Sequence, residues 1–82
     1  MTARARKIAQ GQARPRKRSV RIGGHDTSVS LEGAFWDALG EIARARGISL
    51  NALIAFVDRE RRGNLSSALR LFVFESLRRR GD

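Results

Sequence analysis

Apolar residues recur at helical spacing in two consecutive segments near the middle of the chain. In the first, residues 33–46, one face would carry Ala34, Phe35, Ala38, Leu39, Ile42 and Ala43. In the second, residues 50–61, one face would carry Leu50, Leu53, Ile54 and Val57. Gly47 is suited to the left-handed position that ends a helix, and Ser49 is suited to cap the next one. The pattern predicts two helices joined by a short turn.

The second predicted helix is apolar over more than one face, because Ala52 and Phe56 widen its stripe. Such a helix is usually buried on two sides, and a dimer interface would supply the second side. A third segment, residues 65–79, carries apolar residues on one face at Leu65, Leu69, Phe72 and Val73, and elsewhere at Leu71 and Phe74. This predicts a third helix. Its apolar surface either caps the core or holds a protein partner, and the sequence leaves both interpretations open.

Alternation of polar and apolar residues occurs twice before the helices. Residues 27–31 alternate, which predicts a strand, and residues 19–22 alternate over a shorter run. Gly23 and Gly24 lie between the two runs and favour a turn. The two runs form either a hairpin, or a single strand at 27–31 preceded by an arm.

Charge divides the chain unevenly. Residues 1–24 contain eight Arg or Lys and no acid, whereas residues 25–82 contain nine bases and eight acids. The formal charge of +9 therefore comes mostly from the N-terminal part. Such a segment favours binding to a polyanion, most often nucleic acid. We predict a basic, disordered arm at 1–18 and a folded domain at 19–80.

The composition also limits the chemistry. The 82 residues include no Cys and one His, His25, which fits a turn. We find no catalytic constellation and expect no enzyme activity, metal or cofactor. No apolar run is long enough for a membrane span or a secretory signal, so we expect a cytoplasmic, nucleoid-associated protein without a membrane partner. A chain this small is marginal alone, which favours an oligomer.

Residues 27–62 resemble the ribbon-helix-helix family of DNA-binding dimers. The resemblance rests on the alternating strand, the spacing of Leu31, Phe35 and Leu39, and the junction Gly47-Ile48-Ser49-Leu50-Asn51. The stretch through Phe74 is similar to a bacterial subgroup with a third helix. The implied fold is mainly α with a short β-ribbon: a ribbon-helix-helix dimer with an extra C-terminal helix. In that family the strands of two subunits pair and enter the major groove.

The resemblance assigns roles to individual positions. The outward strand residues Asp26, Ser28 and Ser30 would contact bases, although Asp26 stands where a basic residue is common and would repel phosphate. The start of the second helix would contact phosphate through Ser49 and Asn51, unless Ser49 is only an N-cap. Independently of the resemblance, the charge of the N-terminal part predicts further phosphate contacts through Arg14, Arg16, Lys17, Arg18 and Arg21. The dimer core would comprise Val29, Leu31, Phe35, Leu39, Ile42, Leu53, Ile54 and Val57.

The leading hypothesis is a homodimeric, sequence-specific DNA-binding protein that represses transcription or regulates its own gene. One alternative is an antitoxin-like or adaptor protein whose helix at 65–79 binds a protein partner. Another is a non-specific nucleic-acid binder that acts through its basic arm.

Overall fold

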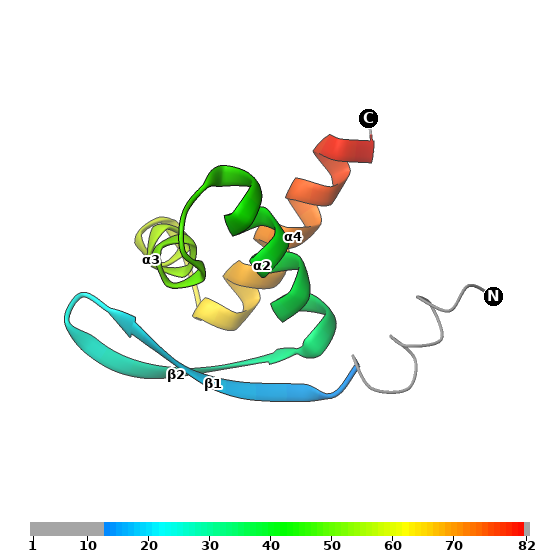
Figure 1. The fold of residues 1–82 in the computed structure, drawn as a ribbon. Coiled ribbons are helices and arrows are strands. Elements are labelled where there is room, and N and C mark those ends of the chain that lie inside the picture. The colour runs from blue at the N-terminus through cyan, green and yellow to red at the C-terminus, as the bar shows by residue number, and fades with distance from the viewer. Residues whose placement is uncertain (1–12, 82) are drawn as a thin grey trace.

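A computed structural model describes residues 13–81, and within them two strands are followed by three helices. The elements are β1 (Pro15–Ile22), β2 (His25–Glu32), α2 (Gly33–Arg46), α3 (Leu50–Glu60) and α4 (Leu65–Gly81). The predicted fold class, mainly helical with a short β-ribbon and an added C-terminal helix, is confirmed. The three predicted helices match within two residues at each end. Figure 1 shows the hairpin along one side of the molecule and the helices on the other.

The two strands form an antiparallel hairpin within one chain, so the hairpin interpretation is the correct one. Ile22 pairs with His25 across a turn of Gly23 and Gly24, whose φ angles are 59° and 83°. Two consecutive positive φ angles are what a tight hairpin turn of the favoured hand requires, and glycine adopts them without strain. The ribbon expected from two subunits is thus present in a single chain.

The hairpin begins earlier than the sequence indicated. β1 starts at Pro15, so residues 15–18, which we assigned to the disordered arm, belong to a strand. They are held there by pairing, from Pro15 with Glu32 to Arg18 with Val29, rather than by any apolar alternation of their own. The rest of the predicted arm, residues 1–12, lies outside the described residues.

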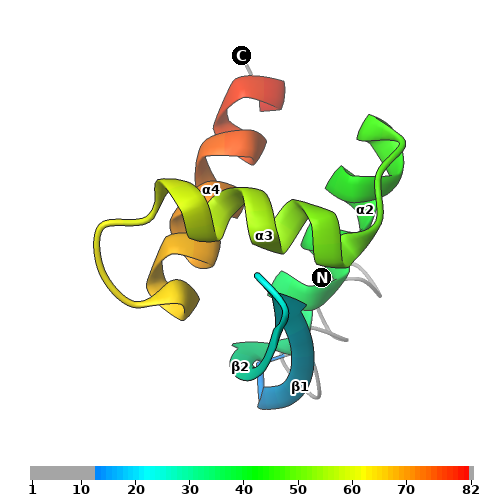
Figure 2. The same cartoon turned by 90° about the vertical axis from the view of Figure 1, so that its left-hand side faces the viewer.

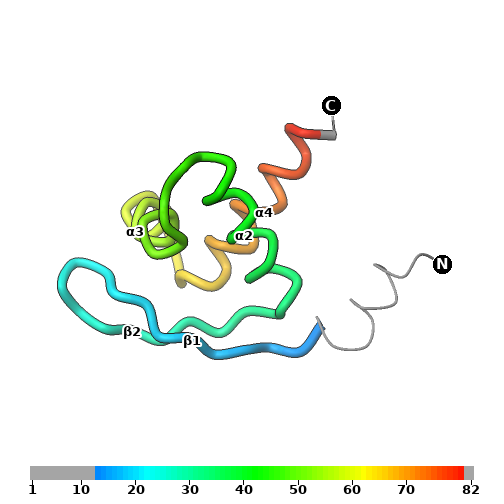
Figure 3. The backbone as a smooth tube through the Cα atoms, in the orientation of Figure 1, coloured from blue at the N-terminus to red at the C-terminus, as the bar shows by residue number. Residues whose placement is uncertain are grey.

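One face of the hairpin packs on the helices. Val20, Val29 and Leu31 are buried on that face, beneath α2, α3 and α4. The chain passes from β2 directly into α2 at Gly33, as the backbone trace in Figure 3 shows. The core residues are Val20, Val29, Leu31, Trp36, Leu39, Ile42, Ala43, Leu53, Ile54, Val57, Leu69 and Val73. Hairpin and helices therefore share one core.

The residues that the sequence assigned to a dimer core are covered within one chain. Seven of the eight are buried, and the eighth, Phe35, is packed against the same core. The second covered side of α3, which we expected from another subunit, comes from the chain itself. Leu69 and Val73 of α4 join the core beside Leu53, Ile54 and Val57. The wide apolar surface of α3 therefore does not by itself require a second copy.

The helix α4 has two different faces. Its inner face is buried through Leu69 and Val73, so this helix caps the core. Its outer face exposes Leu71, Phe74 and Leu77, at 59%, 56% and 54% of their surface. No helix within residues 13–81 is long and apolar enough to cross a membrane. Among residues 13–81, the outer face of α4 thus carries three of the five large apolar side chains that are exposed.

Candidate nucleic-acid interface

The outward face of the hairpin is polar and exposed. Side chains alternate along each strand, so the residues between the buried positions point away from the helices. The strand register pairs three sets of outward residues: Lys17 with Ser30, Ser19 with Ser28, and Arg21 with Asp26. All six are exposed. We call these six residues the ribbon face.

An ion pair crosses the ribbon face near the turn. Arg21 Nη1 lies 3.5 Å from Asp26 Oδ1, and Arg21 Nη2 donates to the carbonyl of Gly24 at 3.3 Å. Both side chains are exposed, so the pair contributes little to stability. Its effect is electrostatic, because the positive charge of Arg21 partly neutralises the negative charge of Asp26. The repulsion of phosphate expected from Asp26 is thereby reduced.

Half of the ribbon face comes from β1, which sequence reasoning did not place there. Lys17 and Arg21 were predicted as phosphate contacts from a flexible arm, and Ser19 was given no role. The structure sets all three opposite the predicted base-contact residues of β2. The sequence did contain one indication of this placement, the short alternation of residues 19–22. That alternation indicates a strand on the ribbon only if a turn at Gly23 and Gly24 pairs it with residues 27–31.

The other predicted arm contacts lie at the base of the hairpin. The carbonyl of Arg14 accepts the N–H of Gly33 at 3.2 Å. The carbonyl of Arg16 accepts the indole N–H of Trp36 at 2.9 Å. The guanidinium of Arg18 lies over the ring of the same tryptophan, 5.0 Å from its centroid. All three arginines are exposed, but Arg16 and Arg18 pair with Leu31 and Val29 and so lie on the helix side of the hairpin, opposite to the ribbon face.

The start of α3 is fixed to the hairpin. Asn51 Oδ1 accepts the backbone N–H of Arg21 at 2.9 Å, and Asn51 Nδ2 donates to the carbonyl of the same residue. Ser49 is the N-cap, and its Oγ accepts the N–H of Ala52 at 3.0 Å. Figure 2 shows α3 crossing over the hairpin. Ser49 and Asn51, the two predicted phosphate contacts, therefore lie beside the ribbon. The side-chain oxygen of each already accepts a hydrogen bond from a backbone N–H of this chain.

Side chains from the helices bond to both edges of the hairpin. Asn51 occupies the outer edge of β1 at Arg21. On the outer edge of β2, Ser66 Oγ donates to the carbonyl of Ser30 at 3.1 Å. Capped edges disfavour pairing with a further strand. Within residues 13–81 the sheet has two strands, which is the width that the major groove admits.

A second connection joins the hairpin to α4. Arg70 Nε and Nη2 donate to the two carboxylate oxygens of Glu32 at 2.9 and 3.1 Å. This fork of hydrogen bonds lowers the pKa of Glu32 from its usual value of 4.5. Sequence reasoning did not pair these residues, which are 38 positions apart. The pair ties the end of β2 to the helix that closes the core.

Comparison with known proteins agrees with this arrangement. The ribbon-helix-helix domain family matches residues 15–77, which covers both strands and nearly all of the three helices. The chain belongs to the ribbon-helix-helix family. The family expected from the sequence is thus confirmed, and its match starts at the residue where β1 starts.

One solved structure similar to this ribbon-helix-helix chain is that of an uncharacterized protein from Bordetella pertussis Tohama I. The two share 30% sequence identity with a TM-score of 0.72, over 99% of this chain and 74% of that one. No curated protein matches the chain. Ribbon-helix-helix domains belong to DNA-binding regulators rather than to enzymes, which directs attention to the ribbon face. Within the described residues, no group of His, Cys, Asp and Glu could hold a metal ion.

Proposed function

We propose that this protein is a dimeric, sequence-specific DNA-binding repressor, which inserts the ribbon face of each chain into the major groove. The observation that carries the proposal is the ribbon face itself. It presents two bases, three serines and one acid, all of them exposed, on two paired strands. A repressor acts by occupying its operator, so binding in one register is sufficient for this function.

The dimensions of the hairpin suit the groove. Paired strands lie about 4.8 Å apart, and the major groove is about 12 Å wide. A two-stranded ribbon with its side chains fits such a groove, and a four-stranded sheet is too wide to enter it flat. The capped edges at Arg21 and Ser30 therefore support insertion of a single hairpin.

The ribbon face offers several kinds of base contact. Lys17 can donate to the acceptors of guanine, and Asp26 can accept from the amino group of cytosine. Ser19, Ser28 and Ser30 can each donate or accept, so they discriminate modestly, at the low end of about 1–3 kcal/mol per good contact. We expect most of the selectivity to come from Lys17, Arg21 and Asp26 acting beside the serines.

Phosphate contacts would hold the ribbon in register. The hydroxyl hydrogen of Ser49 remains able to donate while its oxygen caps α3, and the first N–H groups of that helix favour an anion. Asn51 would act indirectly, by holding the start of α3 against the hairpin. Arg14, Arg16 and Arg18, exposed at the base of the hairpin, would add contacts that depend on salt.

Two chains are proposed because one ribbon face reads few base pairs. Six outward residues contact only a short site, and a genome contains many copies of any short site. A homodimer would read two half-sites about one helical turn apart, which raises selectivity. The proposal therefore includes an operator with repeated half-sites.

The first test is selection of bound fragments from the sheared DNA of the source organism, at roughly physiological salt, followed by sequencing. Recovery of a repeated motif would support specific readout and identify the regulated genes. Uniform recovery would contradict it, and would favour non-specific binding by the basic segment.

A matched pair of variants then tests the site on the recovered motif. Ser19→Ala with Ser28→Ala and Ser30→Ala should reduce the preference for the motif over scrambled DNA, while most of the salt dependence remains. The control is Ser67→Ala with Ser76→Ala on α4, which should leave the preference unchanged. An equal preference in the ribbon variant and the wild type would exclude base contacts by these serines.

A further inference from the structure

The helices α2 and α4 end on the same side of the molecule. Helix α2 starts where β2 ends, and α4 starts beside β2, where Ser66 bonds to Ser30. Both helices then run away from the hairpin, and Figures 1 and 2 show their C-terminal ends opposite to it. Their last turns contain five arginines, all exposed, which we call the distal arginine cluster: Arg44, Arg46, Arg78, Arg79 and Arg80.

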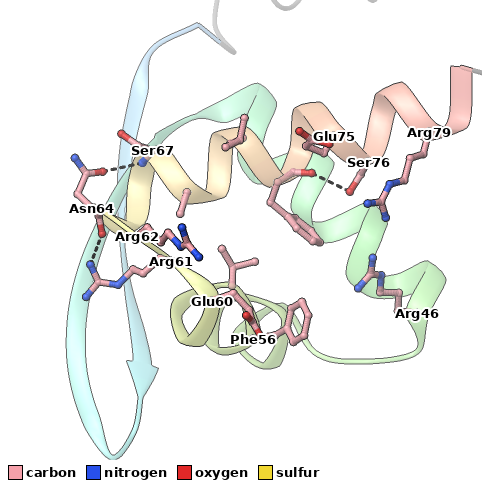
Figure 4. Close-up of a pocket in the computed structure, with 15 residues that line it drawn as sticks. Arg46, Phe56, Glu60, Arg61, Arg62, Asn64, Ser67, Glu75, Ser76 and Arg79 are labelled. Atoms are coloured by element: carbon pink, nitrogen blue, oxygen red, sulfur yellow. Dashed lines mark hydrogen bonds between the residues drawn. The ribbon is translucent and has the colours of Figure 1, made fainter.

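Contacts between α2 and α4 bring the arginines of the two helices together. The guanidinium of Arg46 lies over the ring of Phe72 in α4, 5.3 Å from its centroid. Arg46 and Arg79 both line a groove between α3 and α4, and Figure 4 shows them at the same end of that groove. Residues that are distant in the sequence therefore contribute positive charge to one surface.

Acids do not neutralise the distal arginine cluster. None of its members takes part in an ion pair formed within residues 13–81. The nearest preceding acids on the two helices are Glu41 and Glu75, each three residues before the first arginine of its helix and closer to the hairpin. The cluster therefore presents an excess of positive charge at the helix ends.

The helix dipole explains only part of this arrangement. A basic residue in the last turn of a helix interacts favourably with the negative end of the dipole. That effect acts within each helix separately. The cluster instead gathers like charges from two helices, and these charges repel one another. Repulsion of this kind is relieved when an anion binds to the surface.

The layout of the cluster suits an extended polyanion. Arg78 and Arg80 lie outside the groove that Arg46 and Arg79 line, so the charges do not converge on one pocket. A guanidinium can bind phosphate through two parallel N–H donors. Duplex DNA carries one negative charge for about every 1.7 Å of its axis, so several arginines can contact one duplex together.

The cluster is too far from the ribbon face to bind the same stretch of a straight duplex. The shortest extent of the molecule is 24 Å. At physiological ionic strength, salt screens electrostatic interactions over about 8 Å. DNA bound at the ribbon face would therefore leave the arginines on the opposite side available to a second DNA segment.

We propose that the distal arginine cluster is a second DNA-binding surface, which binds the phosphate backbone of a second duplex without sequence selection. One protein would then hold two DNA segments, the operator at the ribbon face and another at the helix ends. The inference rests on the proposed function for the first segment, and it adds a separate site for the second. Such a protein would close DNA loops between its operator and other DNA.

A bridging assay tests the inference with the full chain. A duplex that carries the recovered motif is attached to beads and saturated with protein, and a fluorescent duplex of scrambled sequence is then added. We expect the wild-type complex to retain the scrambled duplex at roughly physiological salt. Retention should decrease as the salt concentration rises, because each phosphate contact releases counterions.

Two matched double variants locate the contact. Arg44→Gln with Arg46→Gln removes two charges from the cluster, and Arg59→Gln with Arg62→Gln removes two exposed charges near the end of α3. Each pair includes one arginine that lies over a phenylalanine ring. For the scrambled duplex, the first variant should weaken the slope of log affinity against log salt concentration by up to about 2 for each bound chain. The second variant should leave that slope unchanged.

Neutralisation of the whole cluster should have a larger effect. A variant with all five arginines replaced by Gln should lose most of the retained scrambled duplex. Its affinity for the motif should match the wild type, because the cluster lies away from the ribbon face. Circular dichroism should also be unchanged, since all five residues are exposed and outside the core.

Several results would overturn the inference. Unchanged retention in the variant with five substitutions would show that a second ribbon face or the basic N-terminal segment holds the scrambled duplex. An equal loss in the α3 control would show that only net charge matters. A wild-type complex that binds vesicles of phosphatidylglycerol and phosphatidylcholine through the cluster, but no second duplex, would assign this surface to membranes instead.

The outcomes also separate this inference from the proposed function. Binding of the motif by a complex that retains no second duplex would refute the inference alone. If no motif is recovered, the same assay is run with scrambled duplex on the beads. Bridging that then depends on the cluster, without preference for any sequence, would refute the proposed function alone.

Discussion

The side-chain amide of Asn51 bonds to both backbone groups of Arg21, accepting its N–H at 2.9 Å and donating to its carbonyl. The amide thereby takes the place that a neighbouring strand would occupy at that residue. It also fixes the first turn of α3 beside the turn of the hairpin. One side chain therefore couples the ribbon to the helix that would contact phosphate.

Replacement of Asn51 by Ala should loosen the end of the hairpin. Two hydrogen bonds to an exposed strand edge are lost, and we expect the free energy of unfolding to fall by about 1–2 kcal/mol. Urea denaturation measures this change. Amide hydrogen exchange should show faster exchange at Arg21 in particular, because its N–H loses its acceptor.

Ser49→Ala provides the comparison. It removes the N-cap of the same helix, at a cost of about 1 kcal/mol, but leaves the contact with Arg21 in place. In Ser49→Ala, the amide hydrogen of Arg21 should exchange at the wild-type rate after correction for the difference in global stability. Equal local protection of Arg21 in the two variants would show that Asn51 does not hold the hairpin.

Trp36→Phe should destabilise the base of the hairpin. The indole is buried, donates to the carbonyl of Arg16, and lies beneath the guanidinium of Arg18. Phenylalanine keeps an aromatic ring but removes the donor and leaves a small void, at a cost of about 1–3 kcal/mol by denaturation. Phe56→Leu is the matched control, because that ring is exposed, and it should have little effect on stability.

The Glu32–Arg70 pair should make stability depend on pH. The folded state lowers the pKa of Glu32 from 4.5, so the pair stabilises the fold at pH values above 4.5. This contribution to stability is lost as the pH falls through the lowered pKa that Glu32 has in the folded state. Urea midpoints measured from pH 7 down to pH 3 should therefore fall more for the wild type than for Glu32→Gln.

Arg70→Gln should reduce the same pH dependence, because it removes the group that lowers the pKa. The double variant should behave like either single variant, as expected for two partners in one interaction. Additive losses in the double variant would mean that the two residues act on stability separately.

Val29→Asp should unfold the chain. Val29 lies beneath the hairpin in the core, and an unpaired buried carboxylate costs several kcal/mol. Thr27→Asp, two residues earlier on the same side of β2 but exposed, should remain folded. Circular dichroism and thermal melting distinguish the two, and a folded Val29→Asp protein would show that the hairpin does not close the core in solution.

The bases at the start of the chain should contribute affinity but no selectivity. Substitution of Arg4, Arg6 and Lys7 by Ala removes three positive charges from each chain, so the slope of log affinity against log salt concentration should weaken by up to about 3 for each bound chain. Affinity should fall by a similar factor for motif and scrambled DNA. A change confined to the motif would instead indicate that these residues contact bases.

The helices could be predicted from the sequence because apolar spacing, Gly47 and Ser49 are local signals. The hairpin could not be settled, because residues 15–18 carry no alternation of apolar side chains. They are strand only because β2 pairs with them and Trp36 bonds to Arg16. For the same reason the apolar face predicted for residues 33–46 omits Trp36, whereas the structure buries this residue.

Sequence analysis predicted the half of the ribbon face that comes from β2, but not the half that comes from β1. Ser28 and Ser30 follow from the alternation of one strand, and the structure exposes both on the outward side. Lys17, Ser19 and Arg21 required the pairing partner, and the Asn51–Arg21 and Glu32–Arg70 contacts required the tertiary fold. Contacts between residues 30 or more positions apart leave no trace in local spacing.

The turn of Gly23 and Gly24 lets a single chain form both strands of the ribbon. As a result, the residues proposed to contact bases are different residues from those that form the core. The residues on the ribbon face are exposed and take no part in the core, so their identities are free of the packing constraints that fix Val20, Val29 and Leu31. Operator preference could then change by single substitutions at little cost in stability. Such a scaffold is open to evolution of new target sites, and to the same changes made by design.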